Sequence, residues 1–159
     1  MSLPFTADQL NEHIVQNIAT CHSLMALLHK EQEALQNRDA DVIESIIKSK
    51  IPLLETLEHS ARLRSEWTQR AQQAPGQEGW NSLLDELAHS DIRNLWRQLT
   101  DLYQKTREQN EINGKLLSRH QKTVGRVLDV MRGRTSAPTL YTAAGASSSY
   151  ANTTRMGEA

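Results

Sequence analysis

Residues 90–132 read SDIRNLWRQLTDLYQKTREQNEINGKLLSRHQKTVGRVLDVMR, and this stretch decides the fold. Apolar side chains recur in it at spacings of three and four residues, which is the pattern of one face of an α-helix. Ser90 and Asp91 stand at its start and are expected to cap the helix. We therefore predict one helix that extends to about Arg132 and is roughly 60 Å long. Its seam consists of Ile92, Leu95, Leu99, Leu102, Thr106, Gln109, Asn113, Leu116, His120, Val124, Val127 and Met131.

The middle of this seam is polar, because Thr106, Gln109 and Asn113 occupy its central positions. Polar residues in a seam lower stability but fix the register of the helices, and they would keep the bundle loose enough to exchange a partner. Alternatively, these side chains satisfy one another or are satisfied by water. The sequence leaves both interpretations open.

A second long helix is predicted over residues 7–37. Thr6 and Gln9 have the spacing of a capping box at its start. From Ile14 to Leu28 the apolar residues alternate at spacings of four and three, which is typical of a coiled-coil seam. Cys21 lies on this seam, so we expect it to pack as a small hydrophobic side chain rather than to act as a nucleophile.

A third long helix is predicted between these two. The turn at residues 37–41 precedes it, with Asp39 or Asp41 as the N-cap. Pro52 is expected to bend it near residues 48–51, but the apolar periodicity continues across the proline and favours one bent helix over two. A break at residues 74–79 follows, and then a short amphipathic helix over residues 80–89.

These patterns predict an all-α fold: an elongated antiparallel helical bundle or coiled coil of three long helices and one short helix. We assign residues 1–134 to the bundle, because the composition changes after them. Residues 135–159 are rich in Ser, Thr, Ala and Gly and carry only two charges, Arg155 and Glu158. Such a segment buries too little apolar surface to offset the entropy lost on ordering, so we expect a flexible tail.

Composition and charge narrow the classes of function. The chain has 159 residues, and 18 Lys and Arg against 19 Asp and Glu give a net charge of −1, whereas nucleic-acid-binding proteins usually show a basic excess. The single cysteine fits a reducing compartment. Neither a membrane-spanning segment nor a secretory signal is found in the sequence. We expect a soluble, cytoplasmic protein without a nucleic-acid partner or membrane insertion.

Motifs of catalysis and phosphate binding are missing from the sequence, which has no GxxxxGKS or GxxxxGKT, GxGxxG, GxSxG or HExxH. Glu86-Leu-Ala-His89 matches one half of the paired Glu-x-x-His motif of di-iron bundles, but no second copy exists. We predict no enzymatic activity, no metal and no cofactor.

The C-terminal part of residues 90–132 combines apolar and basic side chains. Its basic residues complement the helix dipole, or they steer an acidic partner onto the apolar stripe between them. The apolar residues pack against the other helices, or they receive an amphipathic helix of another protein. The protein is then either a binding chaperone or a structural or oligomeric coiled-coil adaptor. The basic residues, with Asp129 of opposite charge among them, are Lys115, Arg119, Lys122, Arg126, Arg132 and Arg134.

The string Asn110-Glu-Ile-Asn113-Gly114-Lys-Leu116-Leu117 resembles the Asn-x-x-Asn-Gly-x-Leu-Leu signature in the last long helix of the FlgN family of flagellar export chaperones. The pattern Leu27-Leu28-x-x-Glu31-x-x-Ala34-Leu35 is similar to the same family, as are residues 50–57 followed by Arg62 and Arg64. Leu140-Tyr141-x-x-x-Gly145 looks like the family's element just after that helix. Pro52 departs from the family pattern.

This resemblance implies a cytoplasmic chaperone that binds the C-terminal helical region of the hook–filament junction proteins FlgK and FlgL. It also implies delivery to the export gate protein FlhA, with the gate contact at Tyr141. The family motif falls on Asn110, Asn113 and Gly114. Self-association through the same surface stays open. The implied contacts with the exported protein fall on Leu116, Leu117, His120, Val124, Val127, Leu128 and Met131.

Overall fold

The structure is a computed structural model that describes residues 2–132, 140–141 and 147–148. Residues 2–132 contain four helices: α1 (Ala7–Asn37), α2 (Ala40–Arg70), α3 (Gln77–Leu87) and α4 (Ser90–Met131). The prediction of three long helices and one short helix is confirmed. The chain divides into two compact units, residues 1–117 and 118–159, with the boundary inside α4.

Local capping explains where α1 begins and where α2 follows it. The Gln9 amide donates to Thr6 Oγ1 at 3.1 Å and the Thr6 amide donates to Gln9 Oε1 at 2.9 Å, so the predicted capping box is present. Arg38 adopts a left-handed conformation (φ 56°) that ends α1. Asp39 then accepts from the Val42 amide at 3.2 Å, which makes it the N-cap of α2.

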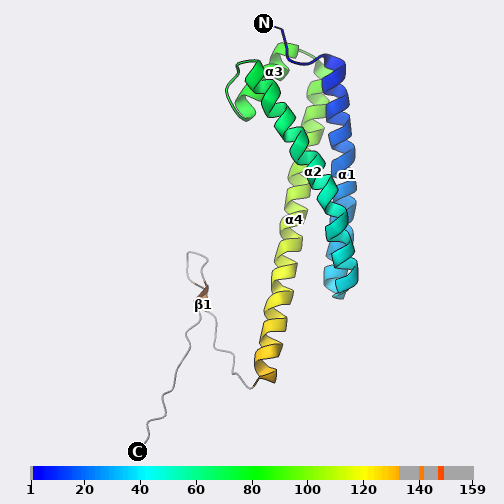
Figure 1. The fold of residues 1–159 in the computed structure, drawn as a ribbon, viewed down its shortest axis with the longest axis vertical. Coiled ribbons are helices and arrows are strands. Elements are labelled where there is room, and N and C mark those ends of the chain that lie inside the picture. Colours follow the sequence, from blue (N-terminus) through cyan, green and yellow to red (C-terminus); the bar gives the residue numbers. More distant parts are fainter. Residues whose placement is uncertain (1, 133–139, 142–146, 149–159) are drawn as a thin grey trace, which may run out of the picture. The chain divides into compact units, whose positions relative to one another are not determined.

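Helix α2 continues through Pro52 without a break. The proline lies in the interior of the helix, as the apolar periodicity predicts, and it does not divide the segment into two helices. Figure 1 shows α2 as one uninterrupted ribbon.

Two predicted helix boundaries need correction. Helix α3 occupies Gln77–Leu87 instead of residues 80–89, because Gly76 (φ 83°) turns the chain into it and Ala88 (φ 51°) ends it. Helix α4 begins at Ser90, but neither Ser90 nor Asp91 caps it. His89 does so, since its Nδ1 accepts from the Ile92 amide at 3.4 Å.

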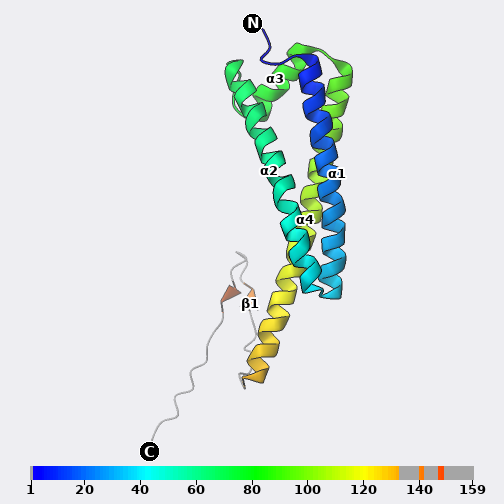
Figure 2. The ribbon, with the colours of Figure 1, turned by 45° about the vertical axis from the view of Figure 1, so that its right-hand side comes forward.

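Side-chain contacts fix the directions of the long helices within residues 1–117. Tyr103 of α4 contacts Asn17 of α1, and further along both helices Asn113 contacts Leu28, so α1 and this part of α4 are parallel. Arg64 and Lys50 of α2 contact His13 and Glu31 of α1 in the reverse order, so α2 is antiparallel to both. Figures 1 and 2 show this arrangement from two sides, with α3 near the N-terminal ends of α1 and α4.

The apolar core of this unit is aromatic at one end. Phe5 contacts Trp67 at a ring-centroid distance of 5.0 Å and Trp80 at 5.9 Å, and Trp80 also contacts Trp96 at 5.3 Å. Burying such large side chains supplies much of the hydrophobic stabilisation of a small domain. The fully buried aliphatic residues of the same cluster are Leu10, Ile14, Leu83 and Leu99, and Cys21 is buried with them.

The segment after α4 contains two short strands, β1 (Leu140–Tyr141) and β2 (Ser147–Ser148). They pair antiparallel, with Leu140 opposite Ser148 and Tyr141 opposite Ser147. Most of the predicted flexible tail, residues 135–159, lies outside the described residues.

Candidate functional site

Asn113, the second asparagine of the quoted motif, is a buried junction between helices. Its side chain is 2% exposed, and its Nδ2 donates to the Leu28 carbonyl at 2.8 Å and to Glu31 Oε1 at 2.9 Å. Lys50 Nζ donates to the same carboxylate at 2.9 Å. Residues of three separate motif segments, Glu31, Lys50 and Asn113, therefore meet at one point and join α1, α2 and α4.

The polar middle of the α4 seam is satisfied internally. Gln109 Nε2 donates to Asn113 Oδ1 at 3.1 Å and to Gln32 Oε1 at 3.0 Å. Thr106 Oγ1 donates to the Leu102 carbonyl at 2.7 Å. Of the two interpretations of this polar segment, mutual satisfaction is the one that the contacts bear out.

The other two motif residues face open space. Asn110 and Gly114 are exposed, and no atom lies within 4 Å of the position that a Cβ on Gly114 would take. Leu116 is half-buried and Leu117 is exposed. Within the motif, then, Asn113 holds the bundle together while Asn110 and Gly114 leave the surface of α4 open.

The apolar stripe beyond the motif is largely solvent-exposed. At about 100° per residue, its members fall within roughly a third of the circumference of α4. His120 is half-buried, whereas the exposed fractions are 58% for Val124, 53% for Val127, 43% for Leu128 and 78% for Met131. A contiguous apolar helix face of this kind is typical of a surface that binds another protein.

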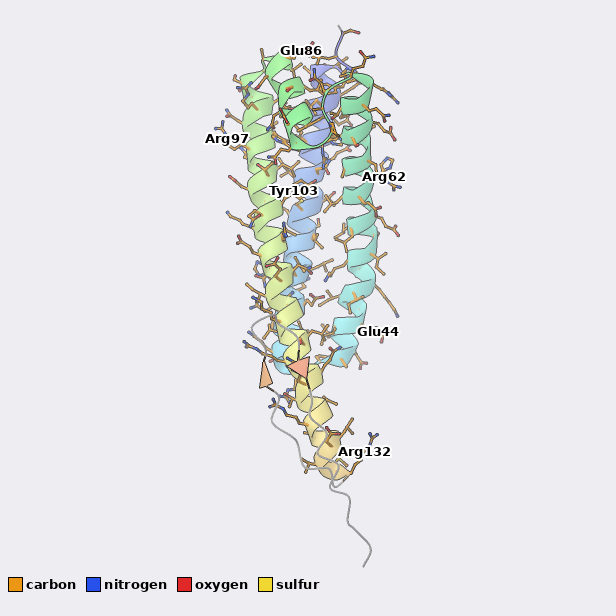
Figure 3. The ribbon with its side chains drawn as sticks, turned by 90° about the vertical axis from the view of Figure 1, so that its left-hand side faces the viewer. Glu44, Arg62, Glu86, Arg97, Tyr103 and Arg132 are labelled. Carbon is orange, nitrogen blue, oxygen red and sulfur yellow. The ribbon has the colours of Figure 1, made fainter. Side chains whose placement is uncertain are left out.

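Four of the six basic residues of this segment lie away from the stripe. Lys115, Arg119, Lys122 and Arg126 are all exposed and follow one another at spacings of four, three and four. Successive helical residues are about 100° apart, so these four lie on the side of α4 roughly opposite the apolar residues. The expectation that the stripe runs between them is corrected: α4 has an apolar face and a separate basic face. Figure 3 shows the side chains along α4 up to Arg132. Arg134 lies outside the described residues.

Tyr141 belongs to β1, where its backbone pairs with Ser147. The assignment of Tyr141 to the export gate stays a prediction.

No cluster of three or more His, Cys, Asp or Glu side chains suited to a metal ion occurs in residues 2–132, 140–141 and 147–148. None of the helices in that same part of the chain is long and apolar enough to cross a membrane. His89 of the Glu-x-x-His pattern instead caps α4.

The patterns of the sequence did not single out one group of polar residues, which surrounds Arg64. Its Nη1 donates to His13 Nε2 at 3.1 Å, its Nη2 donates to Tyr103 Oη at 3.5 Å, and its guanidinium lies 5.3 Å from the centroid of the Trp96 ring. Tyr103 Oη in turn donates to Asn17 Oδ1 at 3.3 Å. Residues of three helices, α1, α2 and α4, thus form one network, which no single helical pattern reveals.

The pKa values of His13, a member of this network, and of the nearby Cys21 are shifted. Burial, with the charge of Arg64 as the next cause, lowers the pKa of His13 to about 4, so this imidazole is neutral at pH 7 and accepts from Arg64. Burial raises the pKa of the Cys21 thiol to about 11. Because nucleophilic cysteines need a lowered pKa, Cys21 is a packing residue, as its position on the seam predicts.

Comparison with known proteins finds one family. The model of the family described as FlgN protein matches residues 1–149 of this chain. No curated protein and no solved structure matches the chain. The matched range includes the motif around Asn113, the apolar stripe on α4 and Tyr141.

Proposed function

This chain belongs to the FlgN family of flagellar export chaperones, and we propose that its clients are the junction proteins FlgK and FlgL. In this proposal it binds their C-terminal helical region in the cytoplasm. It then delivers them to the export gate protein FlhA.

The apolar stripe at the C-terminal part of α4 carries this proposal. We assign client contact to Leu116, Leu117, His120, Val124, Val127, Leu128 and Met131, four of which are at least 43% exposed. A client helix that pairs with neighbours only in an assembled filament has an unpaired apolar face as a monomer. Laying that face on the stripe removes apolar surface of both partners from water, which favours binding by helix-to-helix packing.

Co-elution on a sizing column tests the client assignment. Purified protein mixed with FlgK or FlgL is expected to elute as a complex that is larger than either component. If the chain co-elutes with neither FlgK nor FlgL, the proposal is contradicted. A complex of this chain with itself, at the same elution volume with and without client, would favour the oligomeric adaptor instead.

Two variants on one helix locate the contact. Leu128→Asp places a carboxylate in the stripe and should weaken client binding by at least about tenfold, because a charge must then be desolvated in an apolar contact. Ser118→Asp adds the same charge to an exposed position on another face of α4 and should leave binding within about twofold. Equal weakening by the two variants would rule out the stripe as the contact.

Tyr141 is assigned to a different step. Tyr141→Ala should leave the affinity for FlgK and FlgL unchanged but reduce binding to FlhA in a pull-down. Loss of client binding in this variant would refute the separation of the two contacts.

A further inference from the structure

A cavity of about 470 Å³ lies within residues 1–117 where α2, α3 and α4 approach one another. Its buried part includes Trp80 and Thr68, and its rim includes the exposed side chains of Ser65, Gln77 and Gln104. The aromatic rings of Trp96 and Tyr103 also line the cavity. The cavity is thus an open pocket with an aromatic floor and a polar rim.

The charge of this pocket is entirely positive. Arg64 and Arg107 line it, and none of its lining residues is acidic. Arg107 pairs with Glu111 at 3.5 Å, whereas the side-chain partners of Arg64 are a neutral imidazole, a phenol and an indole face. Within the described part of the chain Arg64 has no carboxylate partner. A half-buried guanidinium without a counter-ion favours an incoming anion.

Trp80, which lines the pocket, and the N-terminus of α3 hold further donors. Trp80 is 4% exposed, and its indole Nε1 is buried without a hydrogen-bond partner. A buried donor left unpaired lowers stability, so an acceptor that reaches it recovers that free energy. Gly76 and Gln77 bring the N-terminus of the eleven-residue helix α3 to the same pocket, and no side chain caps that end.

We propose that this pocket binds an acidic side chain of a partner polypeptide, with the apolar residue next to it against Trp96 and Tyr103. A carboxylate matches the fork of donors on a guanidinium and accepts bidentately. The aromatic wall adds apolar contact, which a free inorganic anion does not use. This inference goes beyond the proposed function, because it involves neither the α4 stripe nor Tyr141.

Arg62 offers a matched control on the same helix as Arg64. Figure 3 shows Arg62 on the outer side of α2 and Tyr103 between α4 and α2. Arg62 is exposed and does not line the pocket. Replacing either arginine by glutamine removes one positive charge from α2, but only the change at Arg64 alters the pocket.

The experiment titrates the full chain with a short blocked peptide that holds one glutamate between two leucines, and follows the tryptophan emission, to which Trp80 and Trp96 of the pocket contribute. We expect saturable binding of the glutamate peptide. Its glutamine analogue should bind with at least about tenfold lower affinity, and Arg64→Gln should lower the affinity for the glutamate peptide by a similar factor. The affinity of Arg62→Gln for the glutamate peptide should lie within about twofold of that of the unchanged protein. Equal affinity for the glutamate and glutamine peptides would overturn the proposal, and so would full displacement of the peptide by inorganic phosphate.

A second variant keeps the test decisive if Arg64→Gln fails to fold. Gln104→Glu adds a carboxylate at the rim of the pocket and replaces none of the residues that contact Arg64, and it removes the hydrogen bond from Gln104 Nε2 to Glu108 Oε1. The new carboxylate should lower the affinity for the glutamate peptide by about tenfold, because it repels the glutamate of the peptide and pairs with Arg64. Unchanged affinity in a folded Gln104→Glu protein would contradict the assignment of the site. Co-elution with FlgK and FlgL should survive all of these variants, which separates this inference from the proposed function.

Discussion

Asn113 shows how one side chain can stabilise a bundle that is otherwise joined by apolar contacts. It donates to a backbone carbonyl of α1 and to a carboxylate that also binds Lys50 of α2. The ion pair is almost buried, with side chains 14% and 7% exposed. A buried carboxylate is destabilising unless hydrogen-bond donors surround it, so the Asn113 amide offsets part of the cost of burying Glu31.

Asn113→Leu should therefore destabilise the fold by about 1–3 kcal/mol, because Glu31 loses a donor that water cannot easily replace. The measurement is urea unfolding followed by circular dichroism. Asn110→Leu, three residues earlier on an exposed face, should change the free energy of unfolding by less than about 0.5 kcal/mol. If both variants had the same effect, the network would contribute nothing specific.

His13 should make stability depend on pH. Its pKa is about 4 in the folded protein and 6.5 in the unfolded chain, so the unfolded chain binds more protons between these values. The His13 contribution to the free energy of unfolding is then complete above pH 6.5 and is lost as the pH falls toward 4. Its slope approaches about 1.4 kcal/mol per pH unit.

The check compares urea unfolding from pH 7 to pH 4 in the unchanged protein and in His13→Gln. The variant should be less stable at pH 7 but should lose less free energy on acidification. His22→Gln, at an exposed position of the same helix, should retain the full slope. An identical pH dependence in all three proteins would show that His13 titrates normally.

Single residues differ in how far the sequence could place them. Cys21 is buried as its seam position predicts, because helical periodicity is local information. The Arg64 pocket could not be predicted, since it needs residues of α2, α3 and α4 brought together by tertiary packing. The apolar periodicity likewise does not indicate that the guanidinium of Arg64 would lie over the ring of Trp96.

At the scale of the elements, helix boundaries follow from caps wherever a cap is a common type. Thr6 and Asp39 are such residues, and the predicted starts of α1 and α2 agree with the structure. The cap of α4 is a histidine, which is not a usual N-cap, and the start of α3 depends on Gly76. The sequence places basic and apolar residues in the same segment of α4, and only their angles about the helix axis separate a basic face from the apolar one.

Gly79 tests the packing of α3. A Cβ at this position would lie 1.7 Å from the Ala74 carbonyl oxygen, so the loop before α3 leaves no room for a side chain. Gly79→Ala should lower the thermal midpoint, with a cost above about 1 kcal/mol, although alanine favours a helix. Differential scanning calorimetry measures this change.

Gly114→Ala provides the opposite case on α4. Nothing lies within 4 Å of the added Cβ, so the variant should stabilise the protein by about 0.5–1 kcal/mol through helix propensity. A stabilising Gly79→Ala would mean that the loop moves away at little cost.

At the scale of the whole molecule, the buried hydrophobic cluster of the described residues lies within residues 1–117. Every buried residue of the hydrophobic cluster lies between Phe5 and Leu99, and the Asn113 junction closes the same unit. The sequence predicts this bundle from periodicity. It does not predict where along α4 burial ends, because the same apolar spacing continues through the exposed stripe.

A chain that ends after Leu117 should therefore keep a cooperative unfolding transition, with a thermal midpoint within about 4 °C of the full chain. It should also lose binding to FlgK and FlgL, because five of the seven assigned contacts are removed. Retained client binding by the shortened chain would move the contact to the first unit. Loss of the cooperative transition would show that residues after 117 support the core.

The burial of Cys21, the single cysteine of the chain, makes site-specific labelling simple. At neutral pH almost none of a thiol with a pKa of about 11 is thiolate, and packing keeps reagents away from its sulfur. A Ser118→Cys protein would then carry one maleimide-reactive group on α4 without removal of the native thiol. One fluorophore per molecule at that point would let the dwell time of each client be recorded by single-molecule fluorescence.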